Sequence, residues 1–299
     1  MLKRSAGKTA EGKGQMNQEW EYYNHALIPT TAPHVTPDVS WMKDSRKWRE
    51  LADGKYPLFA RWTTDFDCQE ETEWWYCIKD DPLDLSALKY KRRRVINQGL
   101  QWVEVKLIMP CEYSHQMAEI NLAARSAYGE ELDVEKEKRE LVQEFERICG
   151  TEALGNREFT GAFLRETGEM IGYGIYEIFD DWVDQSVIKT HPESLKYNVN
   201  AALAYFAADR YMGRDFKVKY ISNGSRNISH ETNYHEYLMK YFGFRKAYCR
   251  LHLRYRFPVG IIVRALYPFR RIIFQKRKIN IFRNIASVLH MEEIHRTFR

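Results

Sequence analysis

A carboxylate in an alternating segment is the first candidate for proton transfer. Glu177 lies in the strand-like segment 170–179, on the side that also carries Tyr173 and Ile175. Burial among these apolar side chains would raise the pKa of Glu177 and suit it to act as a general base. Alternatively, Glu177 is an exposed strand carboxylate whose apolar neighbours pack against a helix on the opposite side.

A histidine beside a glutamate is the second candidate. His230 and Glu231 lie in the polar loop 223–233, directly before an expected helix. An isolated loop histidine equally suits a solvated position or a helix cap. His230 and His235 lack the i, i+4 spacing of a helical zinc pair, so we expect no metal site.

Composition restricts the class of protein that positions these groups. The chain has 299 residues, of which 44% are hydrophobic and 29% charged, enough for one large domain with extensions. We expect residues 1–18 to be disordered. Neither a spanning helix nor a signal peptide is recognisable, which predicts a cytoplasmic protein. The cysteines are odd in number and widely spaced, which indicates reduced and mostly buried thiols.

The N-terminal third is rich in tryptophan and interrupted by prolines. This pattern over 19–98 predicts an irregular extension that packs on the main domain rather than forming its own core. Short helices are expected near 40–53 and 84–98. Strands are expected near 58–63 and 73–79.

Residues 99–256 carry the clearest periodicity. The predicted order is strand, helix, helix, three strands, helix, strand, helix, strand, with the best hairpin at 159–179 and the strictest alternation at 247–255. This order predicts an α/β (α+β) domain with a mixed, mainly antiparallel central sheet flanked by helices.

The same order resembles the GNAT N-acyltransferase superfamily. The resemblance covers about 100–256 and is strongest at the hairpin 159–179, the helix after Pro192 and the Phe-Gly-Phe turn at 242–244. The chain is also similar to divergent Fem-type and polysaccharide-cluster members, in which a strand like 219–224 precedes a long polar loop. Each motif is weak alone, and their order carries the inference.

The resemblance implies acetyl-CoA or another acyl thioester as donor. Two splayed central strands, about 171–178 and 183–189, would bind its pantetheine arm, and the helix start at 192–200 would face its phosphates. The implied donor-binding residues are Val187, Ile188, Lys189, Ser194, Lys196, Asn198 and Asn200. Asn198 and Asn200 replace the glycines usual in the family.

A plain capped helix is the alternative interpretation of this segment. Thr190 and Glu193 fit a capping box, with Pro192 in the first turn. In that case the donor would be an acyl carrier protein or aminoacyl-tRNA, or there would be no donor.

The resemblance further implies acyl transfer, with acetyl expected, to an amine on a sugar or cell-envelope precursor. Glu177 or His230 would take the proton. The tyrosine that often supplies the acid in this family is Met239 here. The alternative is a catalytically inactive binding or scaffold module with the same fold, tethered to membrane or nucleic acid by its basic C-terminal tail. The sequence predicts no oligomeric state.

The C-terminal tail, 257–299, differs in charge from the rest. Between residues 254 and 283 there are nine basic residues and no acidic residue, mixed with aromatic and aliphatic side chains. This composition favours contact of 257–283 with an anionic membrane, at the inner membrane surface, over nucleic acid. A helix that merely covers the sheet is the other interpretation.

Overall fold

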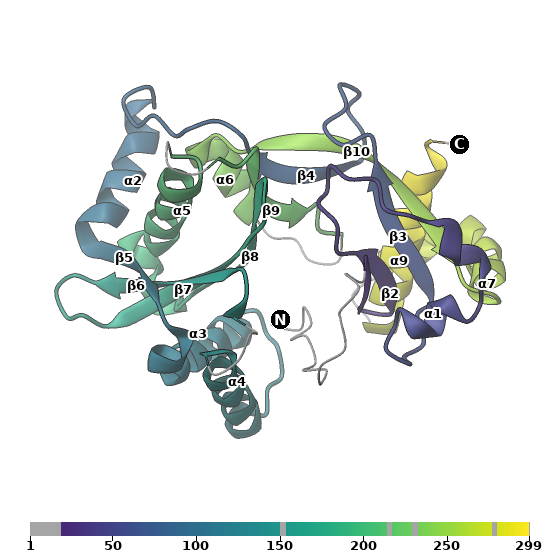
Figure 1. Ribbon diagram of the computed structural model, residues 1–299, viewed down its shortest axis with the longest axis horizontal. Coiled ribbons are helices and arrows are strands. Elements are labelled where there is room, and N and C mark those ends of the chain that lie inside the picture. The colour runs from purple at the N-terminus through teal and green to yellow at the C-terminus, as the bar shows by residue number, and fades with distance from the viewer. Residues whose placement is uncertain (1–18, 150–153, 214–216, 229–232, 277–279, 299) are drawn as a thin grey trace. The chain divides into compact units, whose positions relative to one another are not determined.

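The protein forms two compact units, here called the first and second unit. The computed structural model describes residues 19–149, 154–213, 217–228, 233–276 and 280–298 (Figure 1). The first unit comprises the described parts of 1–76, 225–232 and 246–299. The second comprises the described parts of 77–224 and 233–245.

The second unit is built on a mixed sheet. Its strands are β5 (Val103–Ile108), β6 (Arg157–Leu164), β7 (Met170–Ile178), β8 (Trp182–Thr190) and β9 (Tyr220–Ser225). They are hydrogen-bonded in the order β5-β6-β7-β8-β9. Every neighbouring pair is antiparallel except β8 and β9, which are parallel. A parallel pair needs a crossover, and η4 (Pro192–Tyr197) with α5 (Val199–Tyr211) supplies it.

Helices cover both faces of this sheet (Figure 1). One face packs on α3 (Ser114–Ala127), which follows the short η2 (Pro110–Tyr113), and α4 (Val134–Cys149) packs on α3. The other face packs on α5, which α2 (Tyr90–Trp102) and α6 (Tyr234–Phe242) contact. Val199, Ala202 and Leu203 of α5 are buried against side chains of β5, β6 and β7.

The first unit has strands with a hydrophobic cluster on each face. Its strands are β1 (Trp20–Tyr23), β2 (Ala26–Pro29), β3 (Phe59–Thr64) and most of β10 (Arg245–Tyr255), paired in that order, while β4 (Trp74–Lys79) crosses the division between units. On one face, η1 (Ser40–Lys43) and α1 (Lys47–Glu50) bury Met42 and Trp48 against β2 and β3. On the other, α9 (Asn280–Arg296) buries Met291 and Ile294.

Three further short elements follow β10 in the first unit. They are α7 (Val259–Leu266), η5 (Tyr267–Phe269) and α8 (Arg270–Gln275). Val263 and Ile273 anchor them to Leu289 of α9. Most of the segment 257–283 is therefore helical, with a break at Pro268.

The predicted fold class is confirmed. From β5 to β10 the elements follow the predicted order of strand, helix, helix, three strands, helix, strand, helix, strand. The sheet is mixed and mainly antiparallel, with helices on its faces. The expected Trp-rich extension contains the hairpin β1-β2, which the prolines concealed from sequence periodicity.

The predicted segments fall as follows. Residues 1–18 lie outside the described residues. The described part of 19–76 and the tail belong to the first unit, and most of 99–256 belongs to the second. Within the described ranges, no helix combines the length and apolar composition that crossing a membrane requires.

Two local expectations were wrong. The strands expected to splay, 171–178 and 183–189, are β7 and β8, which pair with each other from Gly172 to Ile178. The expected capping box is absent, because η4 begins after His191 without a side-chain cap hydrogen bond and Asn198 separates η4 from α5 in the left-handed conformation, with φ 53°.

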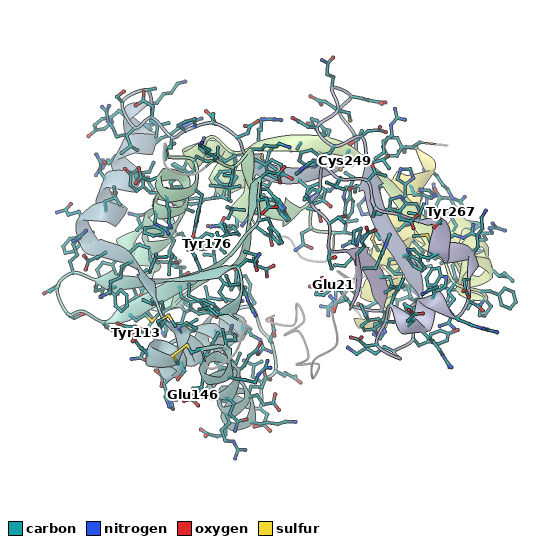
Figure 2. All side chains as sticks on the ribbon, in the orientation of Figure 1. Glu21, Tyr113, Glu146, Tyr176, Cys249 and Tyr267 are labelled. Atoms are coloured by element: carbon teal, nitrogen blue, oxygen red, sulfur yellow. A yellow bond between two sulfur atoms is a disulfide. The ribbon has the colours of Figure 1, made fainter. Side chains whose placement is uncertain are left out.

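The cysteine expectation was wrong in part. Cys111 and Cys149 form a disulfide that joins η2 to the end of α4, visible as a yellow bond near Tyr113 (Figure 2). Cys68, Cys77 and Cys249 are free thiols, and burial raises the pKa of Cys77 to about 12. Spacing along the chain could not reveal that α3 and α4 bring residues 111 and 149 together.

Candidate functional site

The two parallel strands β8 and β9 separate after three residue pairs. Trp182, Val183 and Asp184 pair with Tyr220, Ile221 and Ser222, and beyond Asp184 only β7 still pairs with β8. The next residues of β8 therefore have one backbone edge that β9 does not cover. An unpaired strand edge offers N–H and C=O groups to an extended ligand.

A β-bulge in β8 lies where this split begins. Ile175 pairs with Val187 and Glu177 pairs with Asp184, so Gln185 and Ser186 lie opposite Tyr176 alone. Two residues facing one bend the strand that contains them and increase its twist. The bend turns the rest of β8 away from β9 at the point where their pairing ends.

Two carboxylates meet beside the bulge. The Ser186 hydroxyl lies 3.1 Å from Oδ2 of Asp184 and 3.3 Å from Oε1 of Glu177. A serine hydroxyl has one proton to donate, so it bonds one of these oxygens at a time. Asp184 is only 4% exposed, and Glu177 is half-buried. The three residues form what we call the carboxylate pair with its bridging serine.

The carboxylate pair lies on the α3 face of the sheet. Pairing with β6 is continuous from Tyr173 to Glu177, so Tyr173 and Glu177 point to the same side. The Tyr173 hydroxyl accepts a hydrogen bond from Asn121 of α3 at 2.9 Å. Tyr176 points to the opposite side, where it packs against Tyr211 of α5 at 5.0 Å between ring centroids.

Three buried donors gather on that opposite side, the α5 face. Among the described residues, the hydroxyls of Tyr176 and Tyr234 and the Nε2 amide of Gln185 make no hydrogen bond of good geometry, although the nearby Gln185 amide acts to lower the pKa of both hydroxyls. The three groups are neighbours, because Gln185 influences the pKa of both tyrosines. Burial raises the pKa of Tyr176 to about 12 and that of Tyr234 well above its usual value. Both hydroxyls therefore stay protonated at neutral pH and can donate to an incoming oxygen or sulfur.

Side chains connect the two strands where their backbones part. The Asn223 amide of β9 donates to Oε1 of Gln185 at 3.0 Å. His235, on α6, donates from Nε2 to the Asn223 carbonyl oxygen at 3.0 Å. Burial lowers the pKa of His235, so the neutral imidazole with its proton on Nε2 is the form present at neutral pH.

A charged network supports Tyr176 from α5. Arg210 donates two hydrogen bonds to Glu158, both at 2.8 Å, and the Tyr211 hydroxyl donates a third at 2.8 Å. Burial raises the pKa of Glu158, but the bonds from Arg210 and Tyr211 outweigh it and lower the pKa overall. Figure 2 shows Tyr176 on the α5 side of β7.

The segment expected to face phosphates is exposed in part. Lys196 is exposed and its ammonium lies 5.1 Å from the Tyr197 ring centroid, whereas Ser194 is buried. Asn198 and Asn200 are half-buried at the start of α5, where the first N–H groups lack intrahelical acceptors. Gly99 of α2 approaches this turn so closely that an added Cβ would lie 2.8 Å from the Asn198 oxygen.

The other sequence candidates are placed as follows. Val187, Ile188 and Lys189 lie on the part of β8 beyond the split, and Glu177 lies beside it. Burial lowers the pKa of Lys189. His230 and Glu231 lie outside the described residues. Glu177 pairs with Asp184 through Ser186, so it is not isolated as an exposed strand carboxylate would be.

Sequence reasoning missed Asp184, Gln185 and Tyr234. Strict alternation along 183–189 could have placed Asp184 and Ser186 on one side, but nothing in the residue types marks the bulge between them. Tyr234 is the first residue of α6, far from the position occupied by Met239. Its role depends on the contact with Gln185, which only the fold creates.

A cavity of about 390 Å³ lies between α3 and α4. Its wall includes the carboxylates of Glu119, Glu130 and Glu135 and one ammonium, that of Lys138. Lys138 is bound to Glu119 at 2.7 Å and Arg125 is bound to Glu130 at 2.8 Å, so two of these three carboxylates are already paired with cations. The charge of Glu130 acts to raise the pKa of Lys189, which places this wall near the end of β8. In the described ranges, no three His, Cys, Asp or Glu residues are grouped to hold a metal ion.

Comparisons with known proteins give structural similarity alone. No family model and no curated protein sequence match the chain. A conserved protein of unknown function from Bacteroides thetaiotaomicron has a TM-score of 0.46 at 15% identity, covering 76% of this chain and 78% of its own. FemX has a TM-score of 0.45 at 10% identity, with 69% and 73% covered. A tandem GNAT protein from the clavulanic acid biosynthesis pathway has a TM-score of 0.39 at 13% identity, with 77% and 75% covered. Similarity of this degree indicates no substrate.

Proposed function

We propose that the second unit is an acyltransferase that moves an acyl group from a thioester donor to an amine. The observation that carries this proposal is the carboxylate pair of Glu177 and Asp184 beside the split between β8 and β9. A transferase of this kind needs a base for the acceptor ammonium and donors for the charge that develops on the thioester. Both sets of groups border the same split, on opposite faces of the sheet.

The donor would lie along the free edge of β8. Backbone groups of Val187, Ile188 and Lys189 would hydrogen-bond the amide-containing arm of a donor such as acetyl-CoA. Ser194, Lys196, Asn198 and Asn200, at the start of η4 and α5, would face its phosphates, because helix starts offer N–H donors and a positive dipole end. An acyl carrier protein or aminoacyl-tRNA would also lie along the free edge of β8. The rest of such a donor would contact the protein at other residues than the phosphates of CoA do.

The acceptor would approach from the α3 face. The negative charge of the Glu177 and Asp184 pair on this face favours a cationic amine such as an amino sugar. A carboxylate of the Glu177 and Asp184 pair would take the ammonium proton. The freed nitrogen attacks the thioester carbonyl carbon, and the carbon–sulfur bond then breaks.

The donors on the α5 face would stabilise the developing negative charge. Their hydroxyl and amide protons have no described partner, and a carbonyl oxygen placed in the split would supply one. Because the raised pKa of Tyr234 makes it a weak acid, its role is hydrogen-bond donation to the oxyanion or thiolate. As the amide forms, the nitrogen releases its second proton to solvent, and solvent protonates the leaving thiolate.

A binding or scaffold module without catalysis is the second candidate. It is favoured by Asn198 and Asn200 at positions where the family resemblance expects glycine, and by Met239 where it expects tyrosine. Such a module would bind an acyl thioester without releasing its thiol.

A thiol-release assay separates the two functions. Purified protein is incubated with acetyl-CoA and a panel of primary amines that includes amino sugars, and free thiol is followed against time. Acceptor-dependent thiol release supports acyl transfer. Binding of acetyl-CoA with no release for any amine supports the module, and absence of binding removes CoA thioesters as donors.

A further inference from the structure

A cavity of about 260 Å³ lies in the first unit, where β10 ends and α7 begins. Arginines supply much of its wall. Its lining includes Arg254, Arg256, Arg264, Phe257, Ile261 and Glu292. We call it the cationic cavity. Its residues come from 253–264, at the end of β10 and in α7, and from α9, so the first unit alone forms it.

One arginine of the cationic cavity has an unused buried donor. The Nη1 atom of Arg256 is buried and has no hydrogen-bond partner within the described part of the chain. Its guanidinium is held over the Tyr56 ring, 4.1 Å from the centroid, which fixes the plane of the group. A buried guanidinium nitrogen without an acceptor is unfavourable unless a ligand supplies one.

The remaining charges leave the cavity cationic. Arg254 and Arg264 are exposed and form no ion pair with a described carboxylate. Glu292 is only 4% exposed and already accepts hydrogen bonds from Tyr255 at 2.9 Å and from Arg296 at 2.7 Å. Arg296 thus compensates Glu292, and the three cavity arginines are available to an anion.

Exposed apolar side chains border the cationic cavity. Phe257 is 79% exposed and Ile261 is 58% exposed, and both line it. Ile262 of α7 and Ile272 of α8 are also more than half exposed. Val263 faces the core, so α7 carries apolar residues both toward the protein and toward solvent. A helix of that kind on a protein surface is typical of contact with an apolar medium.

We propose that this surface docks the protein on an anionic phospholipid membrane. The cationic cavity takes the phosphate of one lipid headgroup, with Arg256 donating from its buried nitrogen and Arg254 and Arg264 from the rim. Phe257 and Ile261 enter the boundary between headgroups and acyl chains. Charge complementarity supports the membrane as occupant, and the apolar rim distinguishes it from nucleic acid, for which phosphate contacts require only cations.

Vesicle binding by the full chain tests this proposal. Phosphatidylcholine vesicles are compared with vesicles in which roughly a third of the lipid is phosphatidylserine. We expect binding to the anionic vesicles only, weakened by added salt. The double variant Arg254→Gln, Arg264→Gln removes two exposed cations and should bind about 30-fold more weakly, which is about fivefold per cation.

Matched variants identify which feature is responsible. Lys136→Gln with Arg139→Gln makes the same charge change on exposed positions of α4 and should bind as the unaltered protein does. Ile261→Gln with Ile262→Gln should weaken vesicle binding without affecting binding to an oligonucleotide. Val134→Gln, which alters another exposed apolar residue, is the control for these two.

Three outcomes would overturn the proposal. The first is equal binding to neutral and anionic vesicles. The second is an equal loss of vesicle binding in the α4 control and in the arginine variant, because general charge would then explain it. The third is oligonucleotide binding that needs Arg254 and Arg264 while vesicle binding does not, which would assign the cavity to nucleic acid.

Discussion

The Asn223 side chain donates a hydrogen bond to Gln185 at 3.0 Å, immediately beyond the last backbone pair between β8 and β9. The bond closes the base of the split with side chains instead of backbone. It also occupies the oxygen of the Gln185 amide, so Nε2 is the atom of that amide that is turned toward Tyr176 and Tyr234. One contact therefore connects the bulge, the split and the donors of the proposed site.

Removing either carboxylate should stop the proposed acyl transfer. Glu177→Gln and Asp184→Asn each remove a proton acceptor and should lower kcat by about 100-fold to about 10,000-fold, while donor affinity stays close to that of the unaltered protein. Steady-state thiol release and a thermal unfolding curve measure the two properties.

The exposed Glu166, in the turn between β6 and β7, provides the control. Glu166→Gln should leave turnover unchanged. Full turnover in Glu177→Gln would remove that residue from the mechanism and leave Asp184 as the base.

Tyr234→Phe should stabilise the protein and impair its activity. The substitution removes a buried hydroxyl without a described partner, which should raise the free energy of unfolding by about 1 kcal/mol. The same hydroxyl is the proposed donor to the thioester, so kcat should fall. Urea denaturation and thiol release test the two effects together.

Tyr173→Phe is the matched comparison, because that hydroxyl accepts a hydrogen bond from Asn121 at 2.9 Å. Its removal leaves a buried amide unpaired and should destabilise the fold by about 1–3 kcal/mol. If both variants are destabilised equally, the Tyr234 hydroxyl has a partner in the folded protein and is not held for a ligand.

Glu158 should make stability depend on pH at acidic values. Its pKa is lowered below 4.5 in the folded state, so its contribution is complete above about pH 4.5 and is lost as pH falls through the folded pKa. Glu158→Gln should lower Tm at pH 7, and the difference from the unaltered protein should shrink toward about pH 3. A difference that stays constant across this range would show that the carboxylate charge does not contribute.

The disulfide should stabilise the α3–α4 hairpin. Cys111 and Cys149 are 38 residues apart, and closing a loop of that length is worth about 4 kcal/mol in the chain-entropy treatment. Reduction, or the double variant Cys111→Ala, Cys149→Ala, should lower the free energy of unfolding by up to that amount. Cys68→Ala alters a free thiol and is the control; no change on reduction would show that the bond contributes nothing.

Local periodicity was sufficient for the elements of the second unit. The two strand-like runs of 159–179 predict the hairpin of β6 and β7, and the helical spacing after Tyr234 ends at Gly243, which adopts φ 70° in the structure. These features depend on neighbours within a few residues. Their order along the chain then determines the fold class.

The site depends on register, which no local pattern records. Sequence reasoning placed the split between β7 and β8, whereas the strands that separate are β8 and β9, beside the one extra residue in β8. Glu177 could be selected because its own strand alternates. Asp184 and Tyr234 become candidates only through contacts with Ser186 and Gln185, which come from the bulge.

The measurement that tests the proposed donor site most directly is titration with acetyl-CoA, followed by hydrogen exchange of the complex. We expect micromolar affinity, about −8 kcal/mol, with slowed exchange confined to residues 186–189 of β8 and the start of α5. Binding that protects other segments while leaving 186–189 unchanged would contradict the placement of the donor in the split. No binding of any acyl thioester would contradict acyl transfer itself.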